Sequence, residues 1–352
     1  MNRDRAVGSN QDGPRRWLND HRVAVFVGIA VTVALVSIGV VAQAAHRFDE
    51  RHSAPPDVAV ASGSADPDAP RIYFRHTGVD NSYGLLASVP LADPGGARKI
   101  SDVACDRAYV VPDTVSCLRT LRGVVTRYRL VELDADLNES SSVALPGMPS
   151  RTRISPDGSL IATTTFVAGH SYMQEGFSTA TEIRKVGGGG YGNLERFTLI
   201  LDGKEVHPRD RNIWGVTFAD DNAFYATVAT GDHTWLVRGD LEARTLTSLR
   251  QNAECPSVSP DGARIAYKVG DTASGTHWSF AVLDLATDEE TVLKGETANV
   301  DDQAEWLDDD TILYGLPRDD EAGVTDVWSL DTTADATPQL LIEQAWSPAV
   351  VR

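Results

Sequence analysis

Residues 154–164 read ISPDGSLIATT, and residues 258–268 read VSPDGARIAYK. In both stretches a Ser-Pro-Asp-Gly segment separates one apolar residue from a short run that favours β-structure. Proline presets φ for the first central position of a tight turn, aspartate accepts hydrogen bonds from the local backbone, and glycine adopts positive φ easily. Each stretch therefore predicts two antiparallel strands joined by a hairpin turn.

Weaker copies of this turn read VPDT at 111–114, ADDN at 219–222 and LDDD at 307–310. The five turns start at residues 111, 155, 219, 259 and 307, which gives intervals of 44, 64, 40 and 48 residues. A further β-prone run and a short last strand follow most turns, and no helical period persists for three turns. Four strands in every 40 to 50 residues or so indicate the blades of a β-propeller.

The first unit of this repeat lacks a turn motif of its own. Residues 71–100 supply three β-prone runs but no inner strand, whereas residues 346–351 (WSPAVV) resemble a run that opens a blade. Pairing these two regions closes a ring and removes exposed sheet edges. We therefore predict an all-β fold, a six-bladed β-propeller over residues 71–352, preceded by one transmembrane helix.

The two full turn copies, each followed by two residues and Ile-Ala, resemble the repeats of TolB-type six-bladed propellers, also called WD40-like or PD40 repeats. The resemblance covers residues 71–352 and concerns the fold, because the motif residues build hairpins and perform no chemistry. It implies a role in protein interaction in envelope or transport processes.

Residues 23–45 contain no charged side chain. A helix of this length measures about 34 Å, enough to cross a hydrocarbon core of about 30 Å. The basic residues before it (Arg3, Arg5, Arg15, Arg16 and Arg22) predict that the N-terminal side is cytoplasmic and the remainder extracytoplasmic. We thus expect a cytoplasmic tail at 1–22, a signal-anchor helix at 23–45 and a disordered linker at 46–70, which is rich in Asp, Ala, Pro and Ser.

A cleavable leader is the alternative to this anchor, because Ala42-Gln43-Ala44 resembles a cleavage site that would release a secreted protein. Both alternatives place the propeller outside the cytoplasm. Cys105 and Cys117 lie twelve residues apart around the turn at 111–114, so hairpin strands can bring them within bridging distance. The sequence allows either a disulfide in an oxidising compartment or two buried free thiols.

The interval of 64 residues holds about twenty more residues than a typical blade. We assign the excess to an insertion at 167–191, before an expected third strand at 196–204. Insertions of this kind project from one face of a propeller and carry binding residues. The predicted binding residues in this insertion loop are His170, Tyr172, Glu175, Phe177 and Arg184.

The sequence offers no motif for catalysis, for a metal or for a cofactor. It has no G-x-S-x-G nucleophile elbow, no paired histidine spacing and no calcium-loop pattern. A formal net charge of −18 argues against nucleic acid as a partner. We interpret the acidic runs at 301–302, 308–310 and 319–321 as solvated turns. We expect the strand tryptophans to pack between blades: Trp214, Trp235, Trp278, Trp306, Trp328 and Trp346.

Two functional hypotheses follow from these features. The first is a non-catalytic, membrane-anchored extracytoplasmic propeller that binds a protein or another envelope component. The alternative is a propeller enzyme, or a binder of a small ligand or metal, that acts at the central channel.

Overall fold

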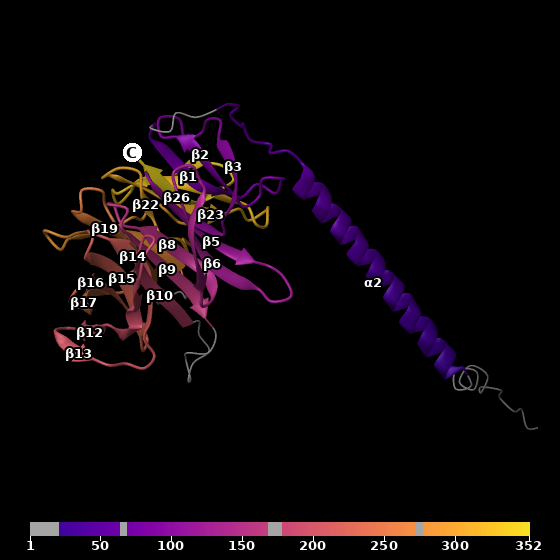
Figure 1. Cartoon of the computed structure of the whole chain (residues 1–352), viewed down its shortest axis with the longest axis horizontal. Coiled ribbons are helices and arrows are strands. Elements are labelled where there is room, and N and C mark those ends of the chain that lie inside the picture. Colours follow the sequence, from indigo (N-terminus) through magenta and orange to yellow (C-terminus); the bar gives the residue numbers. More distant parts are fainter. Residues whose placement is uncertain (1–20, 64–68, 168–177, 272–276) are drawn as a thin grey trace, which may run out of the picture. The chain divides into compact units, whose positions relative to one another are not determined.

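The computed structural model describes residues 21–63, 69–167, 178–271 and 277–352. The chain divides into two units, residues 1–54 and 55–352. The described part of the first unit consists mainly of helix α2 (Arg22–Ser53), whose span Arg22–Arg47 is long and apolar enough to cross a membrane (Figure 1). The helix continues into the range 46–70 that was expected to be disordered.

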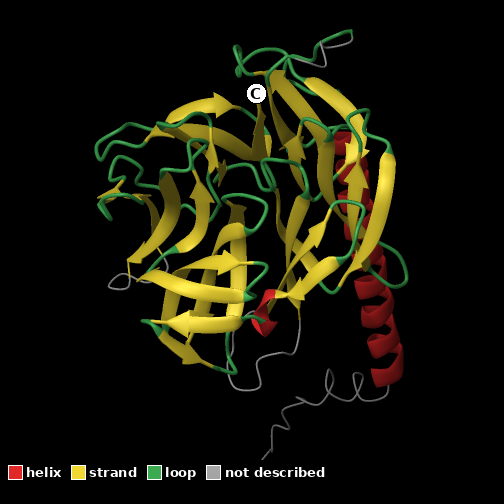
Figure 2. Ribbon diagram, turned by 60° about the vertical axis from the view of Figure 1, so that its left-hand side comes forward, coloured by secondary structure: helices red, strands yellow, loops and turns green. Residues whose placement is uncertain are grey.

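The second unit is a six-bladed β-propeller, with its sheets arranged in a ring (Figures 1 and 2). From the inner to the outer strand, blade 1 contains β26 (Ala345–Val351), β1 (Arg71–His76), β2 (Leu85–Pro90) and β3 (Lys99–Ala104). Blade 2 contains β4 (Arg107–Val111), β5 (Thr114–Leu121), β6 (Arg127–Leu133) and β7 (Glu139–Leu145). Blade 3 contains β8 (Met148–Ile154), β9 (Leu160–Val167), β10 (Ser178–Lys185) and β11 (Gly190–Asn193).

The other half of the ring follows the same order from the channel outward. Blade 4 contains β14 (Asn212–Phe218), β15 (Ala223–Thr230), β16 (His233–Asp240) and β17 (Thr245–Gln251), followed by β12 (Thr198–Leu201) and β13 (Lys204–Val206). Blade 5 contains β18 (Glu254–Val258), β19 (Arg264–Asp271), β20 (His277–Asp284) and β21 (Glu290–Val292). Blade 6 contains β22 (Glu305–Trp306), β23 (Thr311–Pro317), β24 (Thr325–Asp331) and β25 (Gln339–Ile342).

Strand β26 closes the ring, as the sequence predicts. It pairs antiparallel with β1, in a register that places Ile72 opposite Val350. Buried apolar side chains then fill the spaces between neighbouring blades; one such cluster joins Leu86 of blade 1 to Val110 and Val131 of blade 2. Complete burial of side chains of this size stabilises the fold by about 1.5–3 kcal/mol each.

The two Ser-Pro-Asp-Gly turns have the same hydrogen bonds. In the first, the Ser155 hydroxyl donates to Asp157 Oδ1 at 2.5 Å and accepts from the Leu160 amide at 2.9 Å. In the second, Ser259 donates to Asp261 Oδ1 at 2.5 Å and accepts from the Arg264 amide at 2.9 Å. The glycines of the two turns have φ of 73° and 72°. These polar residues satisfy one another within each turn, which confirms their role as hairpin turns.

The expectation that residues 167–191 form an insertion in the long interval between turns is wrong for part of this range. Residues 178–185 of that range form β10, the third strand of blade 3, and residues 168–177 lie outside the described part of the chain. The run at 196–204, expected to be that third strand, instead contributes β12 to the next blade, where β12 pairs in parallel with β17. The hairpin β12–β13 covers the outer edge of blade 4, an arrangement that protects exposed strand edges.

Part of the predicted linker also pairs with the propeller. The amide of Ala61 donates to the Arg98 carbonyl at 2.8 Å, and the amide of Arg98 donates to the Ala59 carbonyl at 2.9 Å. Gln344 Nε2 donates to Asp57 Oδ1 at 2.7 Å. Composition alone suggested disorder, but backbone pairing with the residue before β3 fixes this stretch. The prediction of a linker disordered throughout 46–70 is therefore wrong for these residues.

Candidate functional site

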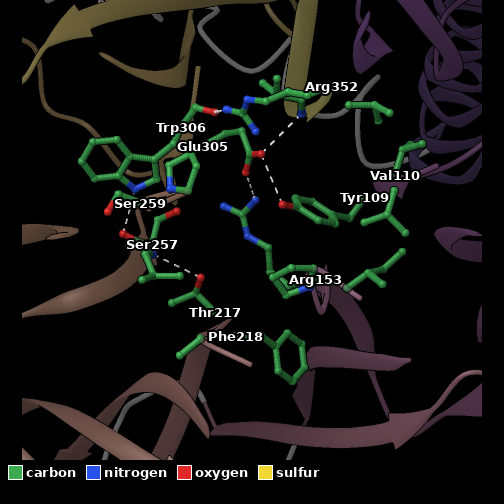
Figure 3. A pocket seen from close by; sticks show the side chains of 18 of the residues that line it. Tyr109, Val110, Arg153, Thr217, Phe218, Ser257, Ser259, Glu305, Trp306 and Arg352 are labelled. Carbon is green, nitrogen blue, oxygen red and sulfur yellow. Dashed lines mark hydrogen bonds and ion pairs between the residues drawn. The ribbon is translucent and has the colours of Figure 1, made fainter. Parts of the chain in front are cut away.

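The two ends of the inner strands lie at two different cavities. Their first residues line a cavity of about 840 Å³, which we call the funnel. Their last residues and the Ser-Pro-Asp-Gly turns line a cavity of about 350 Å³, which we call the turn-side cavity (Figure 3). The channel therefore offers two different environments, one at each end.

The turn-side cavity contains a closed network of buried polar groups. The Arg153 guanidinium forms an ion pair with Glu305 and donates to the Ala304 carbonyl at 2.5 Å. Glu305 Oε1 also accepts from the Tyr109 hydroxyl at 3.2 Å and from the Val350 amide at 3.3 Å. As Figure 3 shows, these side chains converge from different blades.

Burial and neighbouring charges together shift the pKa values of Arg153 and Tyr109. The side chains of Arg153 and Glu305 are each 8% exposed. Burial opposes the charge on Arg153, but Glu305 and Tyr109 outweigh it, and the pKa of Arg153 is raised. Burial, followed by the charge of Glu305, raises the pKa of Tyr109. The ion pair between Arg153 and Glu305 thus joins two blades at this end of the channel.

A narrow neck separates the two cavities. It has a volume of about 20 Å³ and is lined by Arg107 and Arg151, which also line the funnel, and by Tyr109 and Arg153, which also line the turn-side cavity. A space of this size holds about one water molecule. The space between the two cavities is therefore narrow, and Arg107 and Arg151 form the floor of the funnel.

The funnel wall is shaped by β-bulges at the start of inner strands. Register shifts interrupt the pairing of β14, β18 and β26. At these places Gly215, Cys255 and Ser347 have φ of 67°, 51° and 58°. Bulges redirect side chains, and positive φ at residues other than glycine is strained and concentrates at functional sites. The residues that immediately precede these three, and that line the funnel, are Trp214, Glu254 and Trp346.

Cations stack on two tryptophans of the funnel. The Arg107 guanidinium lies 4.5 Å from the centre of the Trp346 ring. Lys268 Nζ lies 4.5 Å from the centre of the Trp278 ring and donates to Asp301 Oδ1 at 2.6 Å. Burial opposes the charge of Lys268, but its neighbours raise its pKa. Burial raises the pKa of Glu254 despite the nearby Lys268.

Two arginines form the floor of the funnel and are poorly matched by carboxylates. Within the described ranges, Arg107 makes neither a hydrogen bond nor an ion pair, and burial followed by the charge of Arg151 lowers its pKa to about 9. Arg151 contacts the Asp301 carbonyl at 3.4 Å and Asp302 Oδ1 at 3.6 Å, both long, and its Nε has no partner. The floor thus presents guanidinium groups with unused hydrogen-bonding capacity.

The binding residues predicted from the sequence do not coincide with the funnel lining. His170, Tyr172, Glu175 and Phe177 lie outside the described residues. Arg184 belongs to strand β10 and not to an insertion loop; it donates to the Gly188 carbonyl at 2.7 Å and pairs with Glu132 at 3.5 Å. The first contact lies within blade 3, and the second joins blade 3 to Glu132 of blade 2, so Arg184 is occupied in holding the scaffold together.

The structure also corrects two interpretations of residue types. Trp214, Trp278 and Trp346 line the funnel, whereas we expected them to pack between blades. Asp302 is buried, accepts from the Gly315 amide at 3.0 Å and contacts Arg151, so it is not a solvated turn residue. The sequence signal was available but weak: arginines and tryptophans near the starts of the runs that open blades.

The two cysteines at the base of blade 2 form a disulfide. Cys105, just before β4, is bonded to Cys117 of β5, and their Cα atoms lie 5.4 Å apart. The bond closes a short hairpin next to Arg107. Elsewhere in the described chain, no group of three or more His, Cys, Asp or Glu side chains is placed to hold a metal ion.

Comparison with known proteins identifies the fold. No protein-family model and no curated protein sequence matches the chain. The structure is similar to TolB from Acinetobacter baumannii, with 14% identity, coverage of 82% of this chain and 68% of that one, and a TM-score of 0.54. It is also similar to a putative TolB from Agrobacterium tumefaciens, with 12% identity, coverage of 78% and 89%, and a TM-score of 0.46.

A puromycin-hydrolysing peptidase from Mycobacterium tuberculosis is similar as well, with 14% identity, coverage of 80% of this chain and 44% of that one, and a TM-score of 0.49. A fold by itself does not decide between binding and catalysis, because one architecture can host many unrelated functions. The chain has the six-bladed β-propeller fold of TolB and related PD40 proteins, together with an N-terminal apolar helix.

Proposed function

We propose that this protein is a non-catalytic, membrane-anchored propeller that binds a protein partner, or another envelope component, at the funnel end of its channel. The observation that carries the proposal is the contrast in polar pairing along the channel. Arg153 and Glu305 on the turn side pair with each other, whereas the funnel combines an aromatic wall with guanidinium groups that have incomplete pairing among the described residues. Concave, largely apolar surfaces with a few convergent polar groups are typical binding sites.

The proposed orientation has the N-terminus in the cytoplasm and the propeller outside it. Two features support it: the basic residues that precede α2, and the disulfide Cys105–Cys117, a bond that persists in oxidising compartments. A reporter enzyme active only outside the cytoplasm, fused after residue 63, should be active. Activity only from a cytoplasmic reporter at that position would contradict the orientation.

The same fusion distinguishes an anchor from a cleaved leader. An uncleaved α2 keeps the reporter in the membrane fraction at full length. Cleavage after Ala44 instead yields a shorter product in the soluble fraction. We propose the anchor, because the apolar span Arg22–Arg47 is longer than the 7–15 residues or so of a typical leader core.

Position-specific crosslinking tests the proposed binding face. Asp232 and Asp221 are both exposed and lie in the turns at opposite ends of strand β15. Asp232 adjoins Gly231 of the funnel lining, whereas Asp221 lies on the turn side. With a photo-crosslinking amino acid at each position, we expect a discrete adduct from 232 that is absent from 221. Equal adducts from both positions would overturn the assignment to the funnel end.

We keep the predicted partner contact at 167–191 as a proposal for residues 168–177 only. Deletion of the whole range would remove β10, so the sharper variant replaces residues 168–177 by a short Gly-Ser segment and keeps Ser178–Lys185. We expect this variant to fold and to lose most of the adduct at position 232. Undiminished recovery of the adduct would show that these residues do not contact the partner.

A small-ligand function is the second candidate, supported by the size of the funnel. Its volume of about 840 Å³ falls within the range of about 300–1,000 Å³ that is usual for small-molecule sites. Purification of the full chain in mild detergent, followed by mass spectrometry under native and denaturing conditions, should reveal any small molecule that remains bound. A stoichiometric compound released only on denaturation would favour this candidate over a protein partner.

A further inference from the structure

The floor of the funnel is a candidate anion site because it holds two guanidinium groups with incomplete pairing. Arg107 is stacked on Trp346 and lacks a hydrogen-bond acceptor in the described structure, and the contacts of Arg151 are 3.4 Å and longer. A guanidinium removed from bulk water is stabilised by charge-assisted hydrogen bonds to an oxyanion, frequently with two parallel bonds. An anion seated here supplies what these groups lack.

The charges around the floor favour a monoanion. Asp301 lines the funnel and is bonded to Lys268, Asp302 contacts Arg151, and Glu254 lies on the wall. These acidic groups repel a dianion such as phosphate more strongly than a single carboxylate. A carboxylate carries a single negative charge and accepts paired hydrogen bonds from guanidinium groups.

The narrow neck favours a carboxylate that belongs to a chain end. Below the arginines only about 20 Å³ of space remains, and beyond it the Arg153–Glu305 pair crosses the channel. A chain terminus can reach the floor without the polymer having to continue through the neck or turn back. Above the floor, the apolar wall includes Trp214, Trp278 and Phe166, surfaces suited to large apolar side chains near that terminus.

We propose that the funnel binds the C-terminal carboxylate of a peptide or protein segment whose last residues are apolar, with Arg107 and Arg151 holding the carboxylate. This proposal rests on the proposed function, since it specifies which part of a protein partner enters the funnel. The two arginines determine specificity for a free chain end, and the tryptophans determine the preference for apolar residues next to it.

The test uses the full chain in detergent and two pools of N-acetylated tetrapeptides that end in Leu, Ile or Phe. One pool has free C-terminal carboxylates and the other has C-terminal amides. Retention by ultrafiltration, measured by mass spectrometry at micromolar to millimolar concentrations, should favour the acids by at least about tenfold in affinity. Equal retention of the two pools, or no retention of either at millimolar concentration, would overturn the proposal.

Variants locate the effect. Arg107→Gln and Arg151→Gln should each weaken retention of the acid pool by about ten- to hundredfold and leave the amide pool unchanged. Arg244→Gln is the matched control, because Arg244 also stacks at 4.5 Å on an aromatic ring, Phe197, but does not line the funnel. Loss of the acid preference in Arg244→Gln, or its persistence in the double funnel variant, would contradict the assignment of the site.

Competition separates a carboxylate site from a phosphate site. Acetate should displace the acid pool at lower concentration than inorganic phosphate does, and the opposite order would assign the floor to phosphate and refute the carboxylate proposal. The crosslinking at position 232 is independent of these measurements. Adducts at position 232 without a preference for acid peptides would support the proposed function and refute the chain-end inference. A preference for acid peptides without adducts would support binding of a carboxylate in the funnel and refute the proposed binding of a protein partner at this face.

Discussion

The two ends of the channel both contain arginines, buried at Arg153 and half-buried at Arg107, but the partners of these arginines differ. Arg153 on the turn side has a carboxylate, a carbonyl and an aromatic ring in contact, whereas Arg107 in the funnel contacts, among the residues that the structure describes, the ring of Trp346 alone. A buried charge with a complete set of partners joins elements together, and its removal leaves the partner uncompensated. A charge without partners contributes little to folding and remains available to a ligand. The comparison shows that the partners of a buried or half-buried arginine, and not the residue type, distinguish an arginine that stabilises the fold from one that can bind a ligand.

The largest effect is expected from Glu305→Gln, which leaves Arg153 buried without its counter-charge. We expect the free energy of unfolding to fall by about 3–5 kcal/mol, measured by urea denaturation of the full chain in detergent. Asp310→Asn is the control, because Asp310 forms an ion pair with Arg264 but its side chain is 85% exposed, and a surface pair contributes about 0–1 kcal/mol. An equal loss of unfolding free energy in the two variants would show that the Arg153–Glu305 pair contributes no more to stability than a surface ion pair.

Loss of the disulfide should have the next largest effect and should act on the funnel end. Replacement of both Cys105 and Cys117 by Ala opens a loop with a sequence separation of 12 and should lower the free energy of unfolding by about 2–4 kcal/mol. Because Cys105 lies two residues before Arg107, the variant should also weaken retention of acid peptides. Unchanged peptide retention would show that the position of Arg107 is fixed by β4 pairing alone.

Substitutions of the turn glycines test the stability of the hairpin turns and leave the charged residues of both cavities unchanged. Gly158→Ala and Gly262→Ala place a side chain at φ of 73° and 72°, which costs about 1–2 kcal/mol each. Crowding adds nothing, since the closest described atom to an added Cβ is 3.8 Å away at Gly158 and none lies within 4 Å at Gly262. Thermal unfolding should show similar losses for both variants and unchanged peptide retention. A difference above about 1 kcal/mol between them would contradict the equivalence of the two turns.

The smallest effect on stability is expected from Arg107→Gln. Only the stacking on Trp346 is lost, which is worth about 0.5–1 kcal/mol, and the cost of burying an unmatched charge is relieved. The free energy of unfolding should therefore change by less than about 1 kcal/mol in either direction, in contrast to Glu305→Gln. A loss comparable to that of Glu305→Gln would mean that Arg107 is a scaffold residue and would remove the basis for the funnel site.

Most of the architecture was predictable because hairpin chemistry is local. The turns at 155–158 and 259–262 specify strand reversals, and their spacing specifies blades, so six blades and closure by 346–351 followed from the sequence. The third strand of blade 3 was misplaced because both 178–185 and 196–204 favour β-structure. Nothing local states that the second run pairs in parallel with β17 of the next blade.

The candidate site was much harder to predict. Sequence reasoning looked for function in an insertion and assigned Arg184 to it, whereas Arg184 pairs with Glu132 across blades. Trp346 and Arg107 are 239 residues apart in the chain and become neighbours only because β26 closes the ring beside β4. A residue pattern cannot show which of several arginines acquires a counter-charge from another blade.

The sequence by itself determined the apolar helix, the repeat and the turns, because each depends on residues within a few positions of one another. Only the tertiary structure decided which charges are saturated and which are not. That outcome depends on contacts between blades, such as Arg153 with Glu305, whose separation of 152 residues carries no signal in a single sequence. It also depends on the bulges that turn Trp214 and Trp346 toward the channel, because the conformation of one strand is fixed there by the strands packed against it.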